Sequence, residues 1–90
     1  MTLEQERELY QAALAKWGRE SQLDMVIEEC AELIDAIQKF RRGRVRAEQI
    51  GEELADVQNC INQFIPAYPN FKTMRQFKLE RLADLLNATK

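Results

Sequence analysis

Two short acidic motifs contain the residues whose types and spacing could do chemistry. Residues 28–33, EECAEL, and residues 52–57, EELADV, share the pattern Glu-Glu-x-Ala-acid-aliphatic and begin 24 positions apart. In each motif the second Glu and the later acid are three residues apart, a spacing that makes two side chains neighbours on one face of a helix. The four carboxylates so placed are Glu29, Glu32, Glu53 and Asp56.

The repetition of the motif predicts a cluster of carboxylates. On a helical wheel of about 100° per residue, Glu29 and Glu53 lie at the edges of their apolar arcs. Glu32 and Asp56 lie about 60° further out, on the same rotational side. If the two helices pack antiparallel, a two-fold axis brings both acidic pairs to one side of the layer. Carboxylates that converge in this way repel one another unless a cation lies among them.

The chain has no His, so any bound metal would be held mainly by oxygen. Hard oxygen ligands favour Mg²⁺ or Mn²⁺ over zinc. Mg²⁺ retains water ligands and is commonly completed by substrate phosphates, which points to a phosphorylated small molecule as substrate. The alternative interpretation is that each acidic pair is an ordinary solvated flank of its helix.

Other side chains could contact such a substrate. Lys78 and Arg81 fall inside the apolar arc of the last predicted helix, where they either reach water along that surface or point at phosphate oxygens. Lys16 and Trp17 end the first predicted helix, and Trp17 could pack in a core or stack on a base. Gln22 lies two turns before the first acidic motif and could read a base edge or cap its helix.

The elements that must position these residues are helices. Gly18, Gly43 and the stretch 66–70 divide the chain into four segments, and three of these four have an amphipathic period near 3.6. The helices are expected to begin after Thr2 in a capping box with Gln5, near Ser21, near residue 46 and after Asn70. Their expected ends are Gly18, about residue 42, about residue 65 and about residue 87. We therefore predict an all-α, four-helix bundle with short loops, forming a single domain over residues 1–90.

Composition limits the class of protein. The 90 residues include 13 Lys+Arg and 15 Asp+Glu, for a net charge of −2, which disfavours nucleic acid as a partner. No apolar run is long enough to cross a membrane and the N-terminal residues do not resemble a signal peptide, so we expect a cytoplasmic protein. A chain this short is marginally stable alone, which favours association of subunits.

Taken together, the motifs resemble the signature of the MazG-like all-α NTP pyrophosphohydrolase superfamily, which includes the dimeric dUTPases and dCTPases. The acidic part of that signature is EExxE at residues 28–32, followed after 20 intervening residues by ExxD at residues 53–56. The approach KWG at residues 16–18 and the KLxRL run at residues 78–82 are similar to short phage and bacterial members.

The resemblance implies a helical bundle that forms dimers or tetramers and hydrolyses a (deoxy)nucleoside triphosphate to the monophosphate and pyrophosphate with Mg²⁺, Mn²⁺ being a possible substitute. It implies that the four motif acids are metal ligands. From the geometry of the cluster and the absence of a His base, we hypothesise that Glu29 or Glu32 orients or deprotonates the attacking water. The resemblance also implies substrate contacts from Lys16, Trp17, Gln22, Asn59, Lys78 and Arg81, with the last two facing the phosphates from the same or the neighbouring subunit.

Two other classes of protein compete with the enzyme. One is a helical interaction module whose acidic flanks bind a basic partner. The other is a relative that binds nucleotides without hydrolysing them. A gain in thermal stability with Mg²⁺ that depends on the motif acids would distinguish a metal site from an interaction module.

Overall fold

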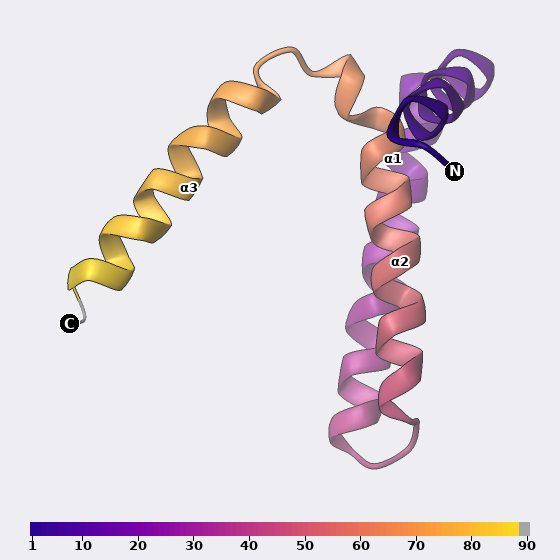
Figure 1. Cartoon of the computed structure of the whole chain (residues 1–90). Coiled ribbons are helices and arrows are strands. Elements are labelled where there is room, and N and C mark those ends of the chain that lie inside the picture. The colour runs from indigo at the N-terminus through magenta and orange to yellow at the C-terminus, as the bar shows by residue number, and fades with distance from the viewer. Residues whose placement is uncertain (89–90) are drawn as a thin grey trace.

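The computed structural model describes residues 1–88, and the all-α fold class is confirmed. The elements are α1 (Leu3–Arg41), α2 (Ala47–Phe64), the short 3₁₀ helix η1 (Ile65–Ala67) and α3 (Phe71–Ala88), as Figure 1 shows. Within the described residues there is no β-strand. None of the helices in residues 1–88 is long and apolar enough to span a bilayer.

Helix α1 is divided by a kink at Gly18. The helix begins at the predicted capping box, in which the Gln5 N–H donates to the Thr2 hydroxyl oxygen at 3.1 Å and the Thr2 N–H donates to the Gln5 side-chain oxygen at 2.8 Å. Gly18 has φ 83° and ψ 163°, a conformation that essentially only glycine adopts. We call residues 3–17 the first arm of α1 and residues 19–41 its second arm.

This kink changes the predicted count of helices. The helical backbone is interrupted at Gly18, as predicted, but no loop separates the two arms, so residues 1–88 form three continuous α-helical elements, the first of which contains the first two predicted helices. Ser21 lies inside the second arm and caps nothing. The remaining boundaries fall close to their predicted positions, since Pro66 lies in η1 directly after α2 and α3 begins at Phe71.

The second arm of α1 and α2 form an antiparallel hairpin. The second arm ends in a Schellman motif, in which the Gly43 N–H donates to the Phe40 carbonyl and the Arg44 N–H to the Lys39 carbonyl, both at 2.9 Å. Gly43 supplies the positive φ of 72° that this turn requires. The hairpin contains the fully buried residues of the chain's described part, which are Gln22, Ala36 and Cys60.

Helix α3 stands apart from the hairpin. After η1 the chain turns away, and among the described residues α3 packs along neither α1 nor α2. Every residue of α3 is exposed. The predicted bundle is therefore not closed by α3 within one chain.

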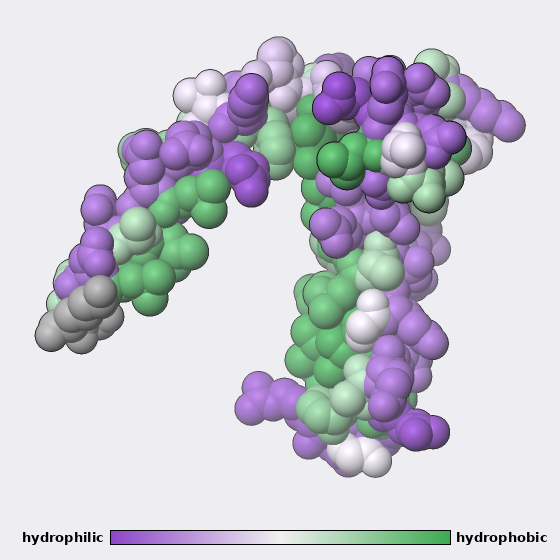
Figure 2. All heavy atoms as spheres, in the orientation of Figure 1, coloured by the Kyte–Doolittle hydropathy of each residue, from purple (hydrophilic) through white to green (hydrophobic). Residues whose placement is uncertain are grey.

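The molecule is open for its size. Its radius of gyration is 16.1 Å, against about 12 Å for a compact domain of this length. Figure 2 shows hydrophobic side chains gathered on the side of the hairpin that faces α3 and on the side of α3 that faces the hairpin. Much apolar surface that a folded domain would normally bury thus remains uncovered.

Candidate active site

Three motif carboxylates meet across the hairpin. Glu29 on the second arm of α1 and Glu53 and Asp56 on α2 each place one oxygen within 4.8 Å of the others. Glu29 and Glu53 are half-buried and Asp56 is exposed. The three side chains meet because the two helices pack antiparallel and because both motifs lie at the edge of the apolar side of their helix. We call these three residues the carboxylate cluster.

The cluster contains two orphaned oxygen atoms. Oε2 of Glu29 and Oε2 of Glu53 are buried and have no hydrogen-bond partner among the described residues. Burial raises the pKa of both carboxyl groups, and the negative charges of Glu32 and Asp56 raise it further. Glu32 lies outside the 4.8 Å group but close enough to act electrostatically on Glu29 and Glu53. The site concentrates negative charge that nothing in the described chain neutralises.

This arrangement fits a divalent cation. A buried acceptor without a donor is costly, and a metal ion would satisfy the orphaned oxygens and the excess charge together. The donor set consists of carboxylate oxygens only, the set that hard cations prefer. The residues that could hold the ion are the cluster, with Glu32 beside it.

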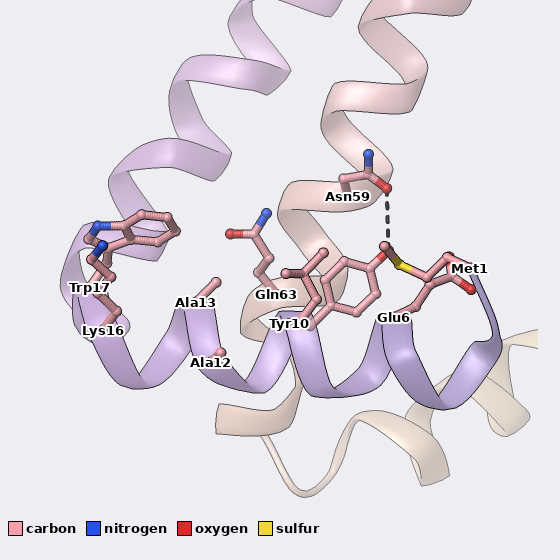
Figure 3. Close-up of a pocket in the computed structure, with 10 residues that line it drawn as sticks. Met1, Glu6, Tyr10, Ala12, Ala13, Lys16, Trp17, Asn59 and Gln63 are labelled. Carbon is pink, nitrogen blue, oxygen red and sulfur yellow. Dashed lines mark hydrogen bonds between the residues drawn. The ribbon is translucent and has the colours of Figure 1, made fainter.

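A pocket of about 610 Å³ is lined mainly by the first arm of α1, together with Asn59 and Gln63 of α2. The first arm of α1 crosses the C-terminal part of α2 there, and Figure 3 shows the side chains that line the space between them. The Tyr10 hydroxyl donates to Oδ1 of Asn59 at 3.3 Å. Asn59 lies one helical turn beyond Asp56 on α2, so the pocket and the cluster adjoin along one helix.

The pocket has a flat aromatic side and a polar side. Trp17 is 56% exposed and lines the pocket, and Nζ of Lys16 lies 5.5 Å from the centre of its ring. In Figure 3 the Gln63 amide extends toward the Trp17 ring, and Asn59 lies further along α2. A planar group could stack on the indole while its edge meets these amides.

Sequence reasoning missed most of the lining residues, including the polar side chains of Tyr10 and Gln63. Of the residues that line the pocket, Lys16, Trp17 and Asn59 were the ones expected near a substrate. The signal was available in the spacing, because Tyr10 lies seven residues before Trp17 and Gln63 lies four after Asn59. Each therefore shares a helix face with a residue that had been singled out.

Gln22 has a different environment from that expected. Its side chain is 1% exposed, its Oε1 has no hydrogen-bond partner in the described residues, and it does not line the pocket. Since the second arm of α1 begins at residue 19, Gln22 does not cap it. The interpretation as a helix cap is wrong, and a contact to substrate remains a prediction.

The two cations of α3 that were predicted to contact phosphates lie away from the cluster within one chain. Lys78 and Arg81 are exposed, and neither forms an ion pair with a carboxylate of residues 1–88. Nζ of Lys78 lies 5.8 Å from the centre of the Phe77 ring. A single chain thus does not bring these predicted phosphate contacts to the predicted metal ligands.

Comparison with protein families agrees with the acidic motifs. The MazG nucleotide pyrophosphohydrolase domain matches residues 18–67, more than half of the chain. The chain belongs to this MazG family. The matched segment contains the whole hairpin and all four motif acids, while all of the first arm of α1 and all of α3 lie outside it. Searches of curated proteins and of solved structures returned no match.

Proposed function

We propose that this MazG domain is a Mg²⁺-dependent nucleoside triphosphate pyrophosphohydrolase that converts a (deoxy)nucleoside triphosphate to the monophosphate and pyrophosphate. The observation that carries the proposal is the meeting of three carboxylates, two with orphaned oxygens, beside a pocket with an exposed indole. The MazG family match supports the same reaction class. The substrate would place its base in the pocket and its phosphates at the cluster.

Glu29, Glu32, Glu53 and Asp56 would hold Mg²⁺, with Mn²⁺ as a substitute. The metal, when bound, would neutralise charge on the phosphoryl oxygens and lower the pKa of a bound water. Glu29 or Glu32 orients the attacking water and accepts its proton. A raised carboxyl pKa, as at Glu29, favours that acceptance.

The remaining predicted residues hold the substrate. Trp17 stacks on the base, Asn59 contacts the nucleoside from α2, and Lys16 lies at the same end of the pocket. Gln22 is the further candidate for a nucleoside contact, through its unpartnered Oε1. Lys78 and Arg81 contact the phosphates, and the enzyme works as a cytoplasmic homo-oligomer, a dimer or a tetramer.

A pyrophosphate-release screen over the standard and oxidised nucleoside triphosphates, with Mg²⁺ or Mn²⁺, tests the proposal. We expect turnover of at least one substrate, a loss of about 10²-fold or more in Glu29→Gln or Glu32→Gln, and unchanged turnover in Glu20→Gln. Glu20 is a matched control because it is exposed on the same arm and outside the cluster. Folded protein that releases pyrophosphate from no substrate would overturn the proposal.

The second candidate function is a helical interaction module, and the uncovered apolar surface favours it. Ile34 and Leu54, for example, are 57% and 51% exposed. This protein would bind a partner without needing a metal. Its melting temperature would be indifferent to Mg²⁺, whereas the enzyme should be stabilised by Mg²⁺ through the cluster.

A further inference from the structure

We propose that the closed end of the hairpin binds single-stranded nucleic acid. We call residues 39–46, which join the second arm of α1 to α2, the hairpin tip. The segment contains no acid, and its five cations are Lys39, Arg41, Arg42, Arg44 and Arg46. This inference uses neither the carboxylate cluster nor the pocket, so it goes beyond the proposed function and does not depend on it.

The first step is that the charge of the chain is unevenly distributed. The hairpin tip holds five of the 13 Lys+Arg and none of the 15 Asp+Glu. The net charge of −2 is therefore the balance of +5 at the tip and −7 over the remaining residues. A low average charge disfavours nucleic acid when the two signs are mixed, whereas a run of like charges creates a local field that attracts a polyanion.

The second step is that the tip cations are accessible. All five are exposed. Nζ of Lys39 lies 2.9 Å from Oδ2 of Asp35, and Nε of Arg46 lies 3.7 Å from Oε2 of Glu48. The tip cations that form no ion pair within residues 1–88 are Arg41, Arg42 and Arg44. Three guanidinium groups are thus left for an anion from outside the chain.

The third step is that the carboxylate cluster lies too far away to neutralise the tip. Glu29 precedes Arg41, the last residue of α1, by 12 positions, which is about 18 Å along a helix. That separation is more than twice the screening length of about 8 Å at physiological salt. In Figure 1 the tip is the free end of the hairpin, away from α3 and from the first arm of α1. The positive charge therefore stands apart from the acids that bind the proposed metal.

The fourth step is that the side chains of the tip suit a nucleic acid. Four of the five cations are Arg, whose planar fork gives two parallel hydrogen bonds to a phosphate. Phe40, between Lys39 and Arg41, is 43% exposed, so its ring can stack on an unpaired base. Cations that follow the backbone and an aromatic ring that takes a base are the combination that binds single strands.

The shape of the tip favours a flexible strand over a membrane or a duplex. Lys39 and Arg41 are two positions apart on one helix, so they point to different sides of it, and Arg44 lies beyond the turn. A flat bilayer or a straight duplex would meet only part of this set, whereas a single strand can bend around it. The apolar residues of the tip are only Phe40 and the half-buried Val45, too few to hold it in a bilayer.

Fluorescence anisotropy of labelled oligothymidylate and oligouridylate tests the proposal. We expect the wild type to bind at least one of them, and we expect unlabelled single strands to compete better than duplex DNA or anionic phospholipid vesicles. With three phosphates neutralised, the logarithm of the binding constant should fall with the logarithm of salt concentration with a slope of about −2. Affinity should therefore drop about 20-fold between 50 and 200 mM salt.

Charge reversal separates the tip from the overall charge of the chain. Arg42→Glu combined with Arg44→Glu should weaken binding by about 10-fold or more. The matched control is Arg19→Glu combined with Lys72→Glu, which changes the net charge equally at exposed positions outside the tip and should leave binding unchanged. Circular dichroism verifies that both variants fold, and Arg42→Gln combined with Arg44→Gln replaces the reversal if it does not.

Removal of the ring tests the stacking contact. Phe40→Leu keeps an apolar side chain and should weaken binding by about 5-fold or more, and unchanged binding would overturn this contact. No binding of either oligonucleotide at low salt, an equal loss in the tip and control variants, or better competition by vesicles or duplex would overturn the proposal as a whole. A wild-type chain that binds single strands but hydrolyses no nucleotide would contradict the proposed function alone.

Discussion

At the scale of residues, the carboxylate cluster should make the metal-free protein more stable at lower pH, because its carboxyl groups are held together in a partly buried site. The pKa values of Glu29 and Glu53 are raised by burial and by neighbouring acids. A carboxyl group whose folded pKa exceeds its unfolded value destabilises the fold when ionised, and that cost is relieved as the pH falls through the folded pKa toward 4.5. Metal-free protein should therefore become more stable as the pH is lowered through these raised pKa values toward 4.5.

Thermal melts in EDTA check this expectation, and Glu29→Gln is the informative variant. Without the Glu29 charge, the melting temperature should depend less steeply on pH than in the wild type. Glu20→Gln removes an exposed charge from the same arm and should leave the slope unchanged. An equal slope in the wild type and Glu29→Gln would contradict the electrostatic account.

The same cluster predicts stabilisation by metal. A ligand that binds only the folded state at 100 times its Kd adds about 2.7 kcal/mol of stability. We expect Mg²⁺ or Mn²⁺ to raise the melting temperature of the wild type, and the gain to disappear in Glu29→Ala combined with Asp56→Ala. Retention of the full gain in this double variant would locate the metal elsewhere.

Much of the carboxylate cluster could be predicted from the sequence, because residue type, repeated spacing and helical periodicity together define a face. The pocket was harder to predict. Trp17 and Asn59 come from segments 42 residues apart, and their meeting depends on the direction that the first arm of α1 takes after Gly18. The burial of Gln22 was also hard to predict. Helical periodicity indicates on which face of the helix Gln22 lies, but not how deeply its side chain is buried.

At the scale of elements, the kink at Gly18 directs the first arm of α1 across α2. Gly18→Ala should lower the free energy of unfolding by about 1–3 kcal/mol, because φ 83° with ψ 163° is strained for any residue with a Cβ. No atom lies within 4 Å of an added Cβ, so the penalty is one of backbone conformation. Chemical denaturation measures it.

The chain offers a matched control for this change. Gly51 also has open space around a built Cβ, but it lies inside α2 without a positive φ. Gly51→Ala should therefore stabilise the helix, by about 0.5–1 kcal/mol. If both substitutions changed stability in the same direction, the conformational explanation would be wrong.

Helix content was predictable from the sequence, but the relation between helices was less so. Capping residues and prolines act locally. The helix boundaries predicted at Thr2, Gly43 and Pro66 are therefore also helix boundaries in the structure. Gly18 was expected to end a helix, and its non-helical φ and ψ do interrupt the helix there, but the second arm follows directly, without a loop. The amphipathic pattern of α3 predicted that one side would be covered, yet within a single chain nothing covers it, because periodicity does not specify which surface is the partner.

At the scale of the whole molecule, the few buried residues of one chain would couple folding to the proposed association of subunits. When the folded form is an oligomer, its apparent stability rises with protein concentration. We expect the melting temperature to increase over a 100-fold range of concentration. Ile34→Asp, which places a charge at an exposed apolar side chain of the second arm of α1, should lower the melting temperature and shift the proposed oligomer toward smaller species in sedimentation. A melting temperature independent of concentration would indicate a fold that is stable as a monomer.

The position of Trp17 also gives the protein an optical reporter. It is the single Trp of the sequence, and it lies half-exposed on the pocket wall beside Lys16. All indole fluorescence therefore originates at the proposed base site. Quenching of this fluorescence by a non-hydrolysable nucleotide analogue would report binding directly. The same titration without metal, or with a catalytically inactive variant, would measure recognition of the base in the absence of phosphate cleavage.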